Sequence, residues 1–233
     1  MKNKITLLGG FALCAMVVVL INSCGKEVLK TTPAVAGKSL TEDFDTMANL
    51  YKKGWAFNNR STPQGAATWQ QGVYAIGKFG PDGFAAYSYE QSPDEYAFAG
   101  YASGNNLSDL DSWMITPPLQ MKNGDKISFY TRTFAGSTFP DRMQVRINLV
   151  DASTDLGNTS TSIGKFTTLI TDINPTLALG GYPEDWTKVS YTISGLTAPV
   201  TGRVAFRYFV AAGGPSGANS NAIGIDLFKF ESL

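Results

Sequence analysis

The sequence contains no histidine among its 233 residues. Without an imidazole side chain, the protein has neither the Ser-His-Asp nor the Cys-His machinery of nucleophilic catalysis, and it lacks the imidazole ligands of zinc and copper sites. A glycosidase needs only two carboxyl groups, so an enzyme with a carboxylate dyad, acting on polysaccharide, remains an alternative. The candidate carboxylates, all in turn-like stretches where a solvated loop is the simpler interpretation, are Asp94-Glu95, Asp109 with Asp111, and Glu184-Asp185.

Charge is scarce and balanced. Charged residues make up 16% of the chain, with 19 basic and 19 acidic side chains, and no basic run is longer than Lys52-Lys53. A protein that binds a phosphate backbone needs an excess of basic residues on one face. We therefore expect no nucleic-acid partner.

One long apolar run is present, from Ile5 to Ile21, and it follows the positive charges of Lys2 and Lys4. Its length of about 17 residues is at the lower limit for spanning a bilayer. The run ends in Ile21-Asn22-Ser23-Cys24, and small residues after a short apolar core are typical of a cleaved secretory signal. We expect residues 1–23 to be a lipoprotein signal peptide; an uncleaved signal anchor or transmembrane helix is the alternative.

Cysteine is limited to Cys14 and Cys24. Cys14 lies in the predicted signal peptide, and Cys24 is expected to carry lipid, so the mature chain has no pair for a disulfide. Several acyl chains on one residue give stable anchoring. We therefore predict a lipidated flexible tether over residues 24–38 and a domain over residues 39–233, held at the cell envelope on the outer membrane, with the face left open.

Alternation of apolar and polar residues dominates the rest of the chain and predicts strands with one buried face. The clearest cases are Arg142 to Val150 and Arg203 to Val210, whereas Phe44 to Lys52 alone suggests a helix, a short one. Asn123-Gly124 lies between two apolar runs and favours a hairpin turn. Together with 24 glycines and 11 prolines, the pattern predicts an all-β antiparallel sandwich or barrel. The other strand candidates are Gly54 to Asn58, Thr68 to Ile76, Phe84 to Tyr89, Tyr96 to Tyr101, Ser112 to Gln120, Lys126 to Phe134, Phe166 to Ile173, Trp186 to Ile193 and Ile223 to Phe230.

Six segments, in order along the chain, carry a resemblance to a known family. They are GWAFNNRSTPQGAATWQQG (54–72), SWMITPPL (112–119), FPDRMQVRINL (139–149), GKFTTLITDINP (164–175), GYPEDWTKVSYTISGL (181–196), and TGRVAFRYFV through GGPSGANSNAIGIDLF (201–228). They resemble the choice-of-anchor J domain, a bacterial extracellular module similar to cleaved-adhesin and MAM-like jelly rolls. The resemblance implies a concanavalin-like or MAM-like jelly-roll β-sandwich on a secreted or surface protein, without a common catalytic activity.

Asp226 interrupts an otherwise almost wholly apolar strand. A buried charge is costly unless it is paired, hydrogen-bonded or bound to a metal, so the residue is either an acceptor of backbone hydrogen bonds or a ligand of a cation such as calcium. By resemblance to calcium-holding jelly rolls, in which acidic residues of the first and last strands converge, Asp45 would join Asp226. Asp111 and Asn105 lie in a predicted loop that could complete the shell of a structural Ca²⁺ ion.

Aromatic side chains are the other candidate contacts for a ligand. Trp69 and the tyrosine-rich segment Tyr87 to Tyr101, with Tyr87, Tyr89 and Tyr96, could present flat surfaces to sugar rings. The alternative is burial, because aromatic residues in strands are mostly core. Together these features predict a non-catalytic binding or adhesion module that recognises glycan or protein; an enzyme and a purely structural envelope protein are the alternatives.

Overall fold

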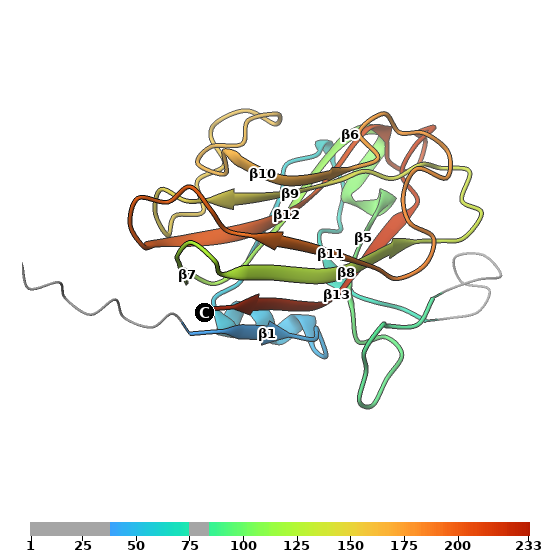
Figure 1. Ribbon diagram of the computed structural model, residues 1–233. Coiled ribbons are helices and arrows are strands. Elements are labelled where there is room, and N and C mark those ends of the chain that lie inside the picture. Colours follow the sequence, from blue (N-terminus) through green and yellow to red (C-terminus); the bar gives the residue numbers. More distant parts are fainter. Residues whose placement is uncertain (1–37, 75–83) are drawn as a thin grey trace, which may run out of the picture. The chain divides into compact units, whose positions relative to one another are not determined.

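The computed structural model describes residues 38–74 and 84–233. The predicted signal peptide, Cys24 and nearly all of the predicted tether lie outside the described residues. The described residues form two antiparallel sheets that lie as two layers (Figure 1). Within these residues, no helix is long and apolar enough to cross a membrane.

The first sheet has six strands in the described part of the chain. Its order is β11-β8-β13-β5-β4, and β1 pairs with β13 beside β5. All of its pairings are antiparallel. The strands are β1 (Leu40–Glu42), β4 (Gln70–Gln71), β5 (Ala97–Gly100), β8 (Lys126–Thr133), β11 (Thr187–Thr192) and β13 (Ala222–Glu231).

The second sheet has seven strands in the same part of the chain. Its order is β10-β9-β12-β6-β2, with β3 paired to β6 and β7 paired to β12. Two short 3₁₀ helices, η1 (Met47–Lys53) and η2 (Tyr101–Ser103), lie in connections. The strands are β2 (Ala56–Asn59), β3 (Thr62–Gln64), β6 (Gly104–Ile115), β7 (Leu119–Met121), β9 (Met143–Asn148), β10 (Thr168–Ile173) and β12 (Val200–Gly213).

The main core lies between the two sheets and is built by the inward faces of alternating strands. Met143, Val145 and Ile147 of β9 are fully buried in it, as their alternation predicts. Phe206 of β12 contacts Phe129 of β8 and Phe228 of β13 edge to face, with ring centroids 5.1 and 5.8 Å apart. This geometry is the favoured one for aromatic pairs and joins the two sheets across the core.

The short helix expected within 44–52 is confirmed as the 3₁₀ helix η1, which spans Met47–Lys53. Two other local expectations are wrong. Phe84 to Tyr89 is not a strand; it crosses the outer face of the six-stranded sheet, where Phe84 packs beside Trp186. Asn123-Gly124 does not close a hairpin, because β7 before it pairs with β12 whereas β8 after it pairs with β11 and β13. The turn therefore carries the chain from one sheet to the other.

Different segments of the chain lie at the two ends of the sandwich. Leu40, at the start of the described domain, pairs with Phe230 near the end of β13, whereas Ala222 at the start of β13 pairs with Gly100. Phe230 lies eight positions after Ala222 along β13, which corresponds to about 26 Å in an extended strand. The N-terminal segment thus enters at one end, and the loops that precede β6, β9 and β13 lie at the other.

Candidate functional site

Exposed tyrosines lie on the outer face of the six-stranded sheet. Tyr87 stacks on Tyr130 of β8, with ring centroids 3.6 Å apart and planes 14° from parallel. One face of the Tyr87 ring covers Tyr130, yet Tyr87 remains 43% exposed, and Tyr89 is 54% exposed. We call Tyr87 and Tyr130 the tyrosine platform. It offers a flat aromatic surface that faces solvent.

The segment that carries Tyr87 is fastened to the sheet on both sides. Ser88 N donates to Asp226 Oδ2 at 2.9 Å, and Trp186 Nε1 donates to Ala85 O at 2.8 Å. Farther along, the Glu95 carboxylate accepts hydrogen bonds from the backbone N–H groups of three residues in its own loop, at 2.7 Å from Glu90 N and 2.9 Å from Ser92 N. The platform is therefore held on a fixed backbone, and Glu95 serves that loop.

Two of the four predicted ligand-contacting aromatics are core residues. Tyr96 is fully buried, packs against Phe84, and its hydroxyl donates to Val73 O. Trp69 is 4% exposed, and its indole N–H donates to Ser112 O at 3.1 Å. Assignment of Trp69 and Tyr96 as ligand contacts is wrong, because the sandwich uses their area for packing. Tyr87 and Tyr89 are accessible.

Asp226 lies on the outer face of β13 and accepts backbone hydrogen bonds with both carboxylate oxygens. Leu227 N donates to Oδ1 at 2.7 Å and Ser88 N to Oδ2. Burial raises the pKa of the Asp226 carboxyl to about 7, and Asp43, just beyond β1, adds to the rise. Burial and the neighbouring Asp45 also raise the pKa of Asp43, whose Oδ1 is buried and has no hydrogen-bond partner within residues 38–74 and 84–233. Acidic residues next to the first and last strands are thus within electrostatic reach of one another.

The four residues predicted as calcium ligands do not meet in one site. Asp111 and Asn105 lie in strand β6 of the other sheet, not in a loop. The Asp111 carboxylate is buried and bound to Arg207, whose Nε donates to Oδ1 at 2.6 Å. Among the described residues, no group of three or more acidic or cysteine side chains is arranged to hold a metal. A shell of Asp45, Asp226, Asp111 and Asn105 is therefore wrong as a single site.

Binding of Ca²⁺ stays a prediction, and Asp43, which lies within electrostatic reach of Asp226, is the residue that tests it. The unpartnered Oδ1 of Asp43 fits a hard cation, because Ca²⁺ is bound by six to eight oxygen ligands, many of them carboxylates. We expect millimolar Ca²⁺ to raise the melting temperature of the mature domain, and Asp43→Asn to abolish the increase. Calorimetry with calcium or with chelator measures it, and Asp155→Asn on an exposed loop is the matched control. An unchanged midpoint removes the prediction.

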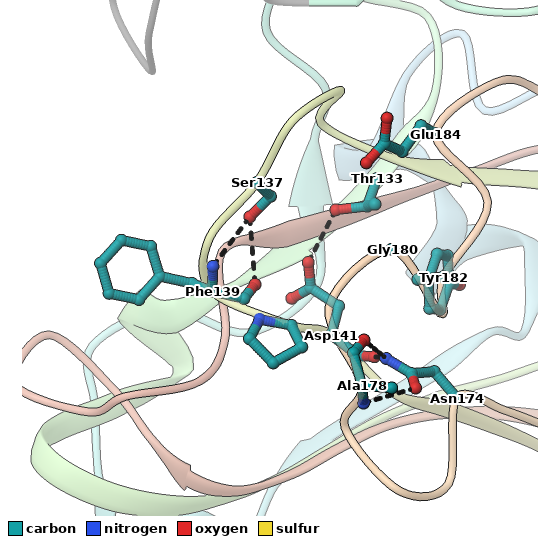
Figure 2. A pocket seen from close by; sticks show the side chains of 10 residues that line it. Thr133, Ser137, Phe139, Asp141, Asn174, Ala178, Gly180, Tyr182 and Glu184 are labelled. Carbon is teal, nitrogen blue, oxygen red and sulfur yellow. Dashed lines mark hydrogen bonds between the residues drawn. The ribbon is translucent and has the colours of Figure 1, made fainter.

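A small pocket of about 10 Å³ lies between the β8–β9 and β10–β11 connections (Figure 2). At its base Asp141 is buried and accepts hydrogen bonds from Tyr208 Oη at 2.5 Å and Asn221 N at 3.0 Å. Burial raises the pKa of the Asp141 carboxyl to about 6, and these hydrogen bonds reduce the rise. Glu184 lines the same pocket.

These carboxyl groups do not present a dyad to a substrate. Both oxygens of Asp141 face partners inside the fold, because Thr133 Oγ1 lies 2.7 Å from its Oδ2. The carboxylates proposed from the sequence serve other roles as well. Asp109 Oδ1 accepts from Ala212 N at 3.0 Å, Asp111 is paired with Arg207, and Asp185 is exposed near Arg132. Each of these contacts supports a structural role.

Comparisons with known proteins agree with the architecture. No family model matches the sequence, and the search of curated proteins found no match. The chain is similar to the K1 cleaved adhesin domain of Lys-gingipain from Porphyromonas gingivalis W83, with 16% identity and a TM-score of 0.50, over 84% of this chain and 99% of that one. The K3 cleaved adhesin domain of the same protein has 14% identity and a TM-score of 0.48, over 83% and 98%.

A third solved structure is the CBM22-1 xylan-binding domain from Paenibacillus barcinonensis, with 14% identity and a TM-score of 0.42, over 86% of this chain and 97% of that one. At 16% identity, the similarity to the K1 domain shows the fold alone. Together with the two antiparallel sheets described above, it shows that this chain has a jelly-roll β-sandwich fold.

Proposed function

We propose that this protein is a lipid-anchored, non-catalytic binding module of the choice-of-anchor J type that recognises glycan at the bacterial cell envelope. The observation that carries the proposal is the tyrosine platform, where the Tyr87 ring is fixed on Tyr130 and keeps one face exposed. Aromatic rings with an apolar face and a polar tip are favoured at binding surfaces. The similarity to a domain named as an adhesin supports a role in attachment.

The charges around the platform suit a polar ligand. Tyr130 lies in register with the exposed Lys188 on β11 and with Asp226 on β13. The Lys188 ammonium can donate to hydroxyl or carboxylate oxygens beside a sugar stacked on Tyr87. Binding therefore would combine an apolar ring contact with hydrogen bonds at its edge, the usual composition of a small-molecule site.

A glycan array probed with the mature domain tests the function. We expect binding to at least one oligosaccharide, and a loss of about tenfold in affinity for Tyr87→Ala, which corresponds to about 1.4 kcal/mol. Tyr51→Ala removes another exposed tyrosine, which packs on Phe57 away from the platform, and is the matched control. An empty array, or equal affinities for the two variants, contradicts the glycan proposal; retention of host matrix protein that depends on Tyr87 would favour a protein ligand.

The lipid anchor is a separate prediction that rests on Cys24 and the preceding apolar run. We expect metabolic labelling with a radioactive fatty acid to mark the wild-type chain, and Cys24→Ser to abolish both the label and recovery in the membrane fraction. Cys14→Ser is the matched control, because Cys14 is expected to leave with the signal peptide. Labelling that persists in Cys24→Ser contradicts the assignment.

A further inference from the structure

A second hollow, separate from the tyrosine platform, lies at the loop end of the sandwich. It has a volume of about 180 Å³ and is lined by the η2 turn, the β8–β9 loop and the β12–β13 loop, through Tyr101, Phe139, Pro215, Ser220 and Asn221. We call it the loop-end groove.

Asn221 joins the three segments that form the loop-end groove. Its backbone oxygen accepts from Tyr101 N at 3.1 Å, and its side-chain Nδ2 donates to Ser137 Oγ at 3.1 Å. Ser137 Oγ in turn accepts from Phe139 N at 3.2 Å, and Ser220 N donates to Pro140 O at 2.9 Å. The backbones that carry Tyr101 and Phe139 are therefore fixed relative to each other before any ligand arrives.

Holding large aromatic rings in water on a fixed backbone is unfavourable for the stability of the fold. Phe139 is 47% exposed and Tyr101 38% exposed, although both are large apolar side chains. Figure 2 shows the Phe139 ring pointing away from Asp141 and the rest of that pocket. Because ordering such loops in advance reduces the entropy lost on binding, this arrangement favours a ligand that covers the rings.

The chemistry of the lining selects the ligand class. The groove is lined by aromatic rings, proline and glycine, with the Ser220 hydroxyl and the Asn221 amide as polar groups, and no charged side chain of the described residues lines it. An anionic ligand would be desolvated there without a cation to pair with it, which is unfavourable. A neutral sugar can stack its apolar ring faces on Tyr101 and Phe139. Its hydroxyl groups can form hydrogen bonds with the Asn221 amide and the Ser220 hydroxyl.

We propose that the loop-end groove is a binding site for a neutral saccharide, which is held between Tyr101 and Phe139. This site rests on the proposed glycan-binding function but is independent of the tyrosine platform. Its position supports display to a ligand, because the groove adjoins the start of β13 whereas the N-terminal segment enters beside the end of β13.

Titration of the mature domain with neutral and with sialylated or sulfated oligosaccharides tests the site. We expect neutral sugars to bind, and Tyr101→Ala and Phe139→Ala each to weaken binding at least tenfold at unchanged melting temperature. Phe139→Leu, which keeps an apolar side chain but removes the ring, should weaken it as well. Val150→Ala, an exposed apolar residue just beyond the far end of β9, is the matched control and should bind normally.

The outcomes separate this site from the proposed function. Neutral-sugar binding that survives both groove variants but is lost in Tyr87→Ala overturns the groove and leaves the function standing. Binding restricted to anionic oligosaccharides also overturns the groove. If no oligosaccharide binds the wild-type domain, the groove and the glycan function both fall.

Discussion

Arg207→Ala is expected to lower the free energy of unfolding by about 3–5 kcal/mol, the usual cost of removing one partner of a buried ion pair. Arg207 and Asp111 are each 2% exposed and lie on the outer face of the seven-stranded sheet. Arg207 Nη1 also donates to Gln144 Oε1 at 3.2 Å, and its guanidinium stacks 3.7 Å from the Phe209 ring centroid. Without Arg207, the Asp111 carboxylate is left buried and uncompensated.

Few other groups can stabilise the Asp111 carboxylate when Arg207 is removed. Its Oδ1 accepts from Trp113 Nε1 at 2.6 Å, but its Oδ2 is buried and has no hydrogen-bond partner among the described residues. Burial raises the pKa of Asp111, and Arg207 opposes the rise. The variant should therefore bind a proton at Asp111 at higher pH than the wild type, and its stability should improve as the pH falls.

Urea unfolding of wild type and Arg207→Ala measures the effect. The double variant Arg207→Met/Asp111→Leu removes both charges and keeps apolar volume, so we expect it to recover most of the lost stability. Lys188→Ala, an exposed cation on β11, is the matched control and should change stability by less than about 0.5 kcal/mol. A loss below about 1 kcal/mol for Arg207→Ala would show that Asp111 remains solvated.

Local alternation was enough to predict the central strands. In β9 and β12 one face meets the inter-sheet core, so period two in the sequence maps directly on to burial. Asn123-Gly124 shows where the same local reasoning ends. Turn chemistry specifies a reversal of the backbone but not which strands the flanking segments join, and β7 and β8 join different sheets.

The roles of single polar residues were less predictable, because their partners come from far along the chain. Asp111 meets Arg207 across 96 residues, and Trp69 meets Ser112 across 43. Phe139 was not a sequence candidate, although a phenylalanine in a Ser- and Pro-containing connection between two strands was a signal of exposure. The groove itself requires three loops that only the strand order brings together.

Asp141 is expected to make stability fall as pH rises from about 4 to about 7. Its pKa is about 6 in the folded protein and about 3.9 in an unfolded chain, so the folded state binds more protons between these values. The stabilisation is complete below pH 4 and is lost as pH rises through 6. A difference of about 2 pKa units corresponds to about 3 kcal/mol.

The hydrogen bonds around Asp141 also predict that stability falls as the pH rises. Thr133 Oγ1 lies 2.7 Å from Asp141 Oδ2 and 2.8 Å from Ala222 O, but its hydroxyl has only one proton for the two oxygens. When Asp141 is protonated, its carboxyl can donate to Thr133 Oγ1, and Thr133 can donate to Ala222 O. When Asp141 is ionised, one acceptor in this buried site loses its hydrogen bond, and burial penalises the charge.

Asp141→Asn isolates this contribution from that of Asp226, whose pKa is also raised. Because asparagine stays neutral, we expect the variant to gain about 3 kcal/mol relative to the wild type between pH 4 and pH 7.5, as measured by urea unfolding at each pH. Glu231→Gln, an exposed residue at the other end of β13, should follow the wild-type curve. Parallel curves for Asp141→Asn and wild type would show that Asp141 does not titrate in this range. A gain confirms that Asp141 is neutral in mildly acidic surroundings and is charged, with a loss of stability, near neutrality.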